Sequence, residues 1–235
     1  MTKTGQQEAV RELLDTYGRT YADEAGIHLK DTPQPLYRLL VMSVLLSARI
    51  RSSTALAAAR ALHDGGMGDA RRMAEASWQD RVDALGRGGY RRYDERTATQ
   101  LGEGAELVLD KYGGDLRRLR KAAREEADDK GGGKTTASLR RLLQEVPGLG
   151  PTGADIFLRE VQGVWPEVAP YLDKKALQGA QQLGLPGKPD ALAPLIGDAS
   201  PAVFAAALVR ASLDKGHALE EEDDEDGDGS GHKGK

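Results

Sequence analysis

Residues 139–161 read LRRLLQEVPGLGPTGADIFLREV, and this stretch decides the fold. Apolar residues recur on both sides of a short turn at i, i+3, i+4 and i+7, which is the spacing of one face of a helix. They are Leu139, Leu142, Leu143 and Val146 before the turn, and Ala154, Phe157, Leu158 and Val161 after it. The sequence therefore predicts a helix, a tight hairpin and a second helix.

The hairpin Val146-Pro147-Gly148-Leu149-Gly150 has the residues for a close approach of its backbone to a ligand. Glycine adopts backbone angles that other residues avoid, so Gly148 and Gly150 are expected to point successive N–H groups outward. Such amides at the start of a helix bind phosphate and hold a DNA backbone without reading its bases. The same pattern fits a plain helical corner in which the glycines serve only the turn.

The rest of the chain is also predicted to be helical, because no segment alternates apolar and polar residues as a strand would. Helices are expected near residues 6–17, 36–48, 54–63, 69–76, 78–85, 116–127, 174–184, 190–196 and 201–214, with a long helix ending near 112. The polar, Gly-rich residues 128–138 predict a mobile linker.

The composition excludes several kinds of site. The chain has no cysteine, so a disulfide, an iron–sulfur cluster and a thiol nucleophile are excluded. The four histidines are far apart in sequence, and we expect no metal site and no cofactor. The N-terminus carries no apolar stretch typical of a secretion signal, and no apolar run approaches the ~20 residues of a membrane span. We expect a cytoplasmic, nucleoid-associated monomer with no membrane partner.

The net charge of −4 hides a slightly basic body. Residues 220–235 hold eight acids and two lysines, so residues 1–219 carry 31 basic and 29 acidic residues, a balance of +2. This balance permits nucleic-acid binding, for which a local basic face matters more than the total. The acidic segment, residues 219–235, is expected to be disordered.

Further stretches occur in a set order around the hairpin. Residues 35–49 read PLYRLLVMSVLLSAR, and residues 165–166, 172–173 and 183–185 read WP, LD and LGL. The first resembles the helix of endonuclease III-like DNA glycosylases that ends in LLSAQ, and VPGLGPTGA at 146–154 resembles that family's LPGVGxKTA. The others resemble its WP, VDTH and RLGL segments. Order and separations agree over residues 30–186, so the chain resembles the helix-hairpin-helix DNA glycosylase superfamily.

The resemblance implies an all-α fold of two helical lobes with a DNA-binding cleft between them. A six-helix lobe at residues 26–164 would contain the helix-hairpin-helix. Residues 1–25 and 165–218 would form the second lobe. The expected partner is double-stranded DNA with a damaged or mispaired base, and the sequence does not identify the lesion.

The resemblance places a catalytic aspartate at Asp173. Cleavage of an N-glycosidic bond builds positive charge on the deoxyribose, and a fixed carboxylate stabilises that charge and activates water. The alternative is that Asp173 only caps the helix that follows it. The family's lyase lysine aligns with Thr152, and threonine cannot form a Schiff base. This difference favours base excision without strand cleavage, unless Lys174 or Lys175 supplies residual lyase activity; exposed lysines contacting phosphate are the alternative.

Other residues are expected to contact DNA. Arg49 replaces the glutamine that the family inserts into the base stack, although a surface arginine at a helix end is an equal alternative. Residues 90–93 read Tyr-Arg-Arg-Tyr, two aromatic rings interleaved with two arginines. This combination suits base stacking and phosphate contact, but also a packed tyrosine beside solvated arginines. The complete set is Arg49, Arg51, Tyr90, Arg91, Pro147, Gly148, Leu149, Gly150 and Lys174.

The sequence thus predicts a monofunctional DNA glycosylase acting in base excision repair. The alternative is a catalytically inactive protein of the same fold that binds damaged DNA. The retained Asp173 argues for the enzyme, and the missing lysine motivates the alternative.

Overall fold

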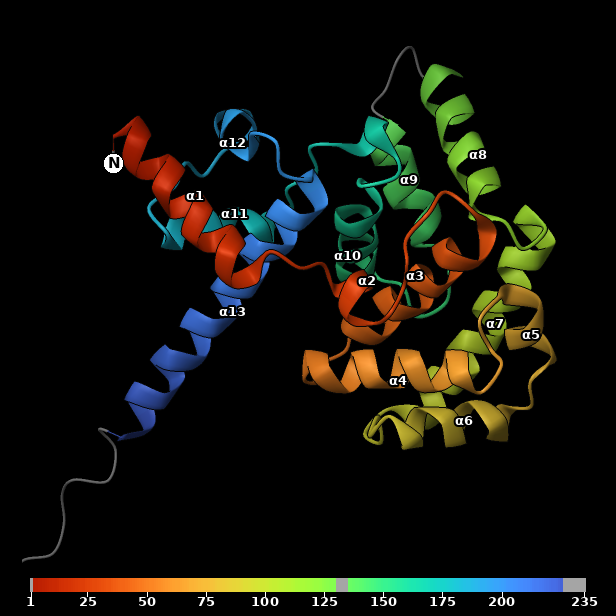
Figure 1. Cartoon of the computed structure of the whole chain (residues 1–235). Coiled ribbons are helices and arrows are strands. Elements are labelled where there is room, and N and C mark those ends of the chain that lie inside the picture. Colours follow the sequence, from red (N-terminus) through yellow and green to blue (C-terminus); the bar gives the residue numbers. More distant parts are fainter. Residues whose placement is uncertain (1, 130–134, 226–235) are drawn as a thin grey trace, which may run out of the picture. The chain divides into compact units, whose positions relative to one another are not determined.

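The computed structural model describes residues 2–129 and 135–225, and side chains within residues 2–128 and 135–214 (Figure 1). The protein is all-α, as predicted, and no described residue lies in a strand. The chain divides into two compact units, Arg19–Tyr171 and Met1–Gly18 together with Leu172–Lys235. Each unit has its own cluster of buried apolar side chains.

The larger unit contains α2 to α10. They are α2 (Tyr21–Glu24), α3 (Pro33–Leu46), α4 (Ser52–Asp64), α5 (Ala70–Glu75), α6 (Trp78–Arg87), α7 (Asp94–Tyr112), α8 (Leu116–Asp129), α9 (Thr135–Leu143), α10 (Pro151–Val161) and the 3-10 turn η1 (Pro166–Val168). The expectation of six helices within residues 26–164 was wrong, because α3 to α10 all begin and end there. The separate helices predicted at 69–76 and 78–85 correspond to α5 and α6, and a capping box at Ser77 and Asp80 starts α6.

Helix α3 is the centre of the larger unit. It is almost wholly apolar, as a helix in the middle of a core should be. Leu36, Leu39, Met42 and Leu45 are fully buried, and α3 contacts α4, α8 and α10. This packing sets the C-terminal end of α3 beside α10, the second helix of the hairpin.

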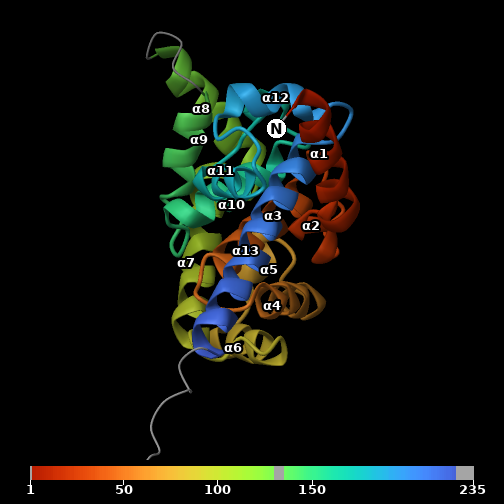
Figure 2. The same ribbon diagram turned by 90° about the vertical axis from the view of Figure 1, so that its left-hand side faces the viewer.

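Helix α4 packs against α6, and α6 packs against α7. This packing positions the start of α7. Figures 1 and 2 both show α4 and α6 side by side, and α6 contacts α7. The contact between α4 and α6 is close, since a Cβ atom on Gly88 would lie 2.3 Å from Cα of Ala58. Buried Arg81 on α6 donates to the carbonyl of Ala98 on α7 at 2.8 Å.

An ion pair joins the two helices of the hairpin. Nε of Arg140 on α9 donates to Oδ1 of Asp155 on α10 at 2.8 Å, and the Tyr171 hydroxyl donates to the same oxygen at 2.6 Å. Gln162 then holds the backbone of Tyr171, accepting from its N–H at 2.7 Å. The arms of the hairpin and the last residue of the larger unit are therefore one hydrogen-bonded group.

The smaller unit comprises α1 (Lys3–Tyr17), α11 (Lys174–Gln182), α12 (Pro189–Ile196) and α13 (Pro201–Glu225). Helix α13 contacts α1 and α11, and a Cβ on Gly179 would lie only 2.0 Å from the carbonyl oxygen of Leu208. The Tyr17 hydroxyl donates to Oδ2 of Asp214 at 2.7 Å. Helices α1 and α11 therefore pack against α13.

Some boundaries differ from the expected ones. The units divide at residues 18/19 and 171/172, where we expected 25/26 and 164/165. Helix α2 was not predicted; Thr20 and the distant carboxylate of Glu160 cap its first amides, and the amide of Ala22 donates to Glu160 at 2.9 Å.

Two segments expected to lack structure are partly helical. Helix α8 reaches Asp129 and α9 begins at Thr135, so the expected linker is shorter, and residues 130–134 lie outside the described ones. Helix α13 extends to Glu225, into the segment expected to be disordered, and residues 226–235 lie outside the described ones.

A search of the described residues for membrane spans found no single helix of sufficient length and apolarity. The pair Pro189–Ile196 and Pro201–Asp214 meets those two criteria together, with a bend of 115° between its members.

Candidate nucleic-acid interface

The hairpin between α9 and α10 turns at Gly148. Its φ is +82°, a left-handed conformation that favours glycine, and the amide of Leu149 donates to the carbonyl of Val146 at 3.0 Å. Gly150 has φ −73° and ψ −172°, extended angles that any residue adopts. The expectation that both glycines supply unusual angles therefore holds for Gly148 and was wrong for Gly150.

The hairpin presents backbone amides without acceptors. Within the described parts of the chain, no group accepts a hydrogen bond from the N–H of Gly148, Gly150, Thr152 or Gly153. Pro151 occupies the first position of α10 and has no N–H. The first bond of the helix runs from the amide of Ala154 to the carbonyl of Gly150 at 3.0 Å. Donors at the positive end of a helix suit an anion such as phosphate.

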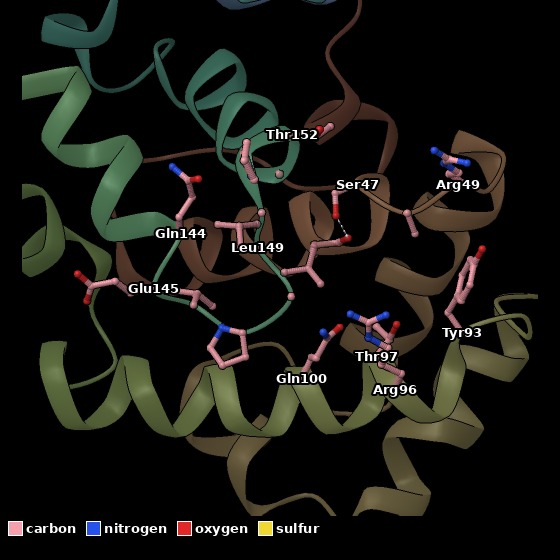
Figure 3. A pocket seen from close by; sticks show the side chains of 18 of the residues that line it. Ser47, Arg49, Tyr93, Arg96, Thr97, Gln100, Gln144, Glu145, Leu149 and Thr152 are labelled. Carbon is pink, nitrogen blue, oxygen red and sulfur yellow. Dashed lines mark hydrogen bonds between the residues drawn. The ribbon is translucent and has the colours of Figure 1, made fainter.

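A cavity of about 660 Å³ opens beside these amides (Figure 3). Three parts of the larger unit line it: the hairpin, the C-terminal end of α3 with the residues after it, and the first turns of α7. Several residues singled out from the sequence meet there, namely Arg49, Tyr90, Pro147, Gly148, Leu149, Gly150 and Thr152.

Other predicted contacts lie elsewhere. Arg51 is the exposed N-cap residue of α4 and Arg91 is exposed before α7, and neither lines the cavity. Lys174, the exposed first residue of α11, and Asp173 belong to the smaller unit.

Tyr90 is part of the core. Its side chain is 2 % exposed, and its hydroxyl lies 3.3 Å from Oγ1 of Thr97. Burial raises the pKa of the Tyr90 phenol, and the hydrogen bond to Thr97 opposes this rise. Because the ring is buried, the packing interpretation fits Tyr90 better than base stacking.

The charge of the cavity is positive. Glu145 is the one carboxylate among the described residues that line it, and it accepts from Nζ of Lys111 and Nη1 of Arg141, each at 2.8 Å. The hydrogen bond from Lys111 is the main reason that the pKa of Glu145 is lowered. Arg49 and Arg96 make no hydrogen bond or ion pair with any described residue, so their charges face the cavity uncompensated.

Sequence reasoning did not identify Arg96 and Gln100, which lie on the first two turns of α7 and line the cavity, whereas Tyr93, which also lines it, belongs to the predicted aromatic and basic stretch 90–93. Arg92 places its guanidinium carbon 5.3 Å from the centre of the Tyr93 ring. Arg96 and Gln100 lie one turn apart on a helix whose sequence shows only ordinary exposed polar positions, so no local signal identified them.

Asp173 is the N-cap residue of α11. Its Oδ1 accepts from the amide of Ala176 at 2.8 Å, and the residue is 9 % exposed. The capping interpretation of Asp173 is therefore confirmed. A capping carboxylate is also held in a fixed position, which is compatible with a chemical role.

Among the described residues, no group of three or more Asp, Glu or His side chains could hold a metal ion. No family model, no curated protein and no solved structure matches this chain.

Proposed function

We propose that the protein is a monofunctional DNA glycosylase that excises a damaged or mispaired base. The observation that carries the proposal is the hairpin of residues 146–150, whose neighbouring amides have no acceptor within the described chain and open onto a cavity with two unpaired arginines. An arrangement of this kind suits the phosphate backbone of DNA, which supplies most of the affinity in such complexes. On this proposal, α9 and α10 are the helix-hairpin-helix.

The chemistry would depend on Asp173. Hydrolysis breaks the bond between C1′ of the deoxyribose and the nitrogen of the base, and the bonding electrons leave with the base. Water then bonds to C1′ and gives one proton to the carboxylate. The departing base takes up a proton from solvent, and the carboxylate returns its proton to solvent, so that one water is consumed. A buried, hydrogen-bonded carboxylate is suited to stabilise the cationic sugar and orient the water.

The products would be a free base and an intact strand with an abasic site. Thr152, exposed on the first turn of α10, has a hydroxyl where the family that the sequence resembles has its lyase lysine. A hydroxyl cannot form the imine that precedes strand cleavage. We therefore propose glycosylase activity without lyase activity.

A binding protein without catalysis is the second candidate. The capping bond from Ala176 favours it, because this bond explains the aspartate without any chemical role. Such a protein would bind DNA with abasic sites and release no base.

The test is incubation of the full chain with duplexes that each contain one lesion, followed by gel analysis with and without alkali. We expect strand breaks only after alkali treatment, with one class of lesion. Breaks without alkali, together with a covalent adduct trapped by borohydride, would show lyase activity at a lysine such as Lys174 or Lys175. Tight binding without base release from any duplex would establish the binding protein instead. The predicted cleft between two lobes, the monomeric state and the cytoplasmic location stay predictions.

A further inference from the structure

Two arginines that line the cavity carry charge that no described residue neutralises. Arg96 lies in the first turn of α7, and Arg49 follows the end of α3. Both are exposed, and Figure 3 shows Arg96 and Gln100 rising from α7 toward the hairpin. Because the cavity's carboxylate, Glu145, is paired with Lys111 and Arg141, an anion entering it meets an excess of positive charge.

We propose that Arg96 and Arg49 form a second phosphate-binding wall, so that the cavity holds two phosphates of one nucleic-acid strand. The hairpin amides would bind one phosphate and the arginines the next. The inference rests on the proposed function in taking DNA as the ligand, and it assigns to Arg96 a role that its sequence context did not indicate.

The shape and composition of the cavity favour a strand over a single anion. Its volume of about 660 Å³ far exceeds that of one phosphate, and its lining combines the hairpin amides with two arginines. A guanidinium donates two parallel hydrogen bonds to the oxygens of one phosphate. The hairpin amides offer donors for the neighbouring phosphate.

A small polyphosphate, such as pyrophosphate or the tail of a nucleotide, is the alternative ligand with this chemistry. Both ligands offer adjacent phosphates, so the test must include each. An undamaged duplex is the proper probe for the backbone, since phosphate contacts do not depend on sequence or lesion.

The experiment measures binding of a labelled undamaged duplex over a series of salt concentrations. It compares the wild type with Arg96→Ala, Arg96→Lys and Arg49→Ala. Arg71→Ala is the matched control, because Arg71 is an exposed arginine on α5 that lies outside the cavity. Thermal unfolding of each variant checks that the fold is intact.

We expect Arg96→Ala and Arg49→Ala each to reduce the slope of log affinity against log salt by about 1, and to weaken binding about tenfold near 0.1 M salt. Arg96→Lys should keep the slope and recover part of the affinity, since lysine retains the charge but not the paired donors. Arg71→Ala should match the wild type.

An unchanged salt slope in Arg96→Ala would overturn the proposal. Inorganic pyrophosphate that binds as tightly as the duplex, and loses affinity in the same variant, would overturn the strand as ligand. Base release, measured separately on lesion duplexes, distinguishes the two proposals. A protein that releases no base but shows the altered salt slope would refute glycosylase activity and support the second wall.

Discussion

A Cβ atom added to Gly148 would lie 3.0 Å from Oε1 of Gln100, so the tip of the hairpin and the side of α7 are in close contact. The same atom would lie 3.2 Å from Cγ1 of Val44 on α3. Three segments far apart in sequence thus meet at one glycine, whose φ of +82° a larger residue adopts only with strain.

Replacement of the two hairpin glycines should therefore have unequal effects. Gly148→Ala is expected to lower the free energy of unfolding by about 1–2 kcal/mol, because of its left-handed φ and its neighbours. Gly150→Ala should change it by less than about 0.5 kcal/mol, since its angles are extended and a Cβ there meets no atom within 4 Å. Urea unfolding of both variants checks this. Equal losses would contradict the assigned roles.

Variants of Asp173 separate its contribution to the stability of the fold from its proposed chemical role. Asparagine caps a helix about as well as aspartate, so Asp173→Asn should unfold like the wild type, whereas Asp173→Ala should lose about 1 kcal/mol. Circular dichroism during urea unfolding provides the comparison. If the asparagine variant were as unstable as the alanine variant, the bond to the amide of Ala176 would not be the main structural role of this side chain.

The contact between α4 and α6 predicts a second pair of variants. Gly88→Ala should cost about 1–3 kcal/mol, because the new methyl group would overlap the backbone of Ala58. Gly86→Ala is the control, since a Cβ at Gly86 meets nothing within 4 Å. Both tryptophans, Trp78 and Trp165, lie in the larger unit, so tryptophan fluorescence reports its unfolding. Identical midpoints for the two variants would show that the two helices are not packed this closely.

Glu167 should make the larger unit sensitive to acid. Burial alone would raise the pKa of this carboxyl, but hydrogen bonds and charges from Arg120, with Arg124, lower it from 4.5 to about 2. Nη2 of Arg120 donates to Glu167 at 2.7 Å. Because the folded pKa is depressed, the stabilisation is complete above 4.5 and is lost as pH falls toward about 2.

Glu167→Gln should accordingly lower the free energy of unfolding by about 1–2 kcal/mol at neutral pH, with the difference from the wild type shrinking as the pH falls through this range. Glu125→Gln is the control, because Glu125 forms an exposed pair with Lys121 at 3.6 Å and no other ion pair with a described residue, and it should contribute well under about 1 kcal/mol. A difference for Glu167→Gln that stays constant with pH would refute the depressed pKa.

The sequence predicted the helices and the hairpin because these depend on local spacing and on turn residues. The periods on either side of Gly148 correspond to α9 and α10, and the apolar residues 36–46 correspond to α3. It also identified several residues of one cavity, since the hairpin and Arg49 lie in recognisable stretches.

What the sequence did not predict depends on tertiary packing. Arg96 and Gln100 line the cavity only because α7 packs beside the hairpin, and nothing in residues 94–112 indicates that packing. The burial of Tyr90 and the carboxylate of Glu160 at the start of α2 likewise follow from contacts between distant segments. The extended angles of Gly150 show that a glycine in a turn does not always supply a left-handed conformation.

The most direct test of the proposed activity is the release of free base from lesion-containing duplexes by the wild type and by Asp173→Asn, measured chromatographically. Both proteins should bind the DNA equally. We expect the wild type to release one class of base and the variant to release none or at least a hundredfold less, as loss of a group that stabilises transition-state charge predicts. Equal release by the two proteins would exclude Asp173 from the chemistry, and no release by the wild type from any duplex would contradict the glycosylase assignment.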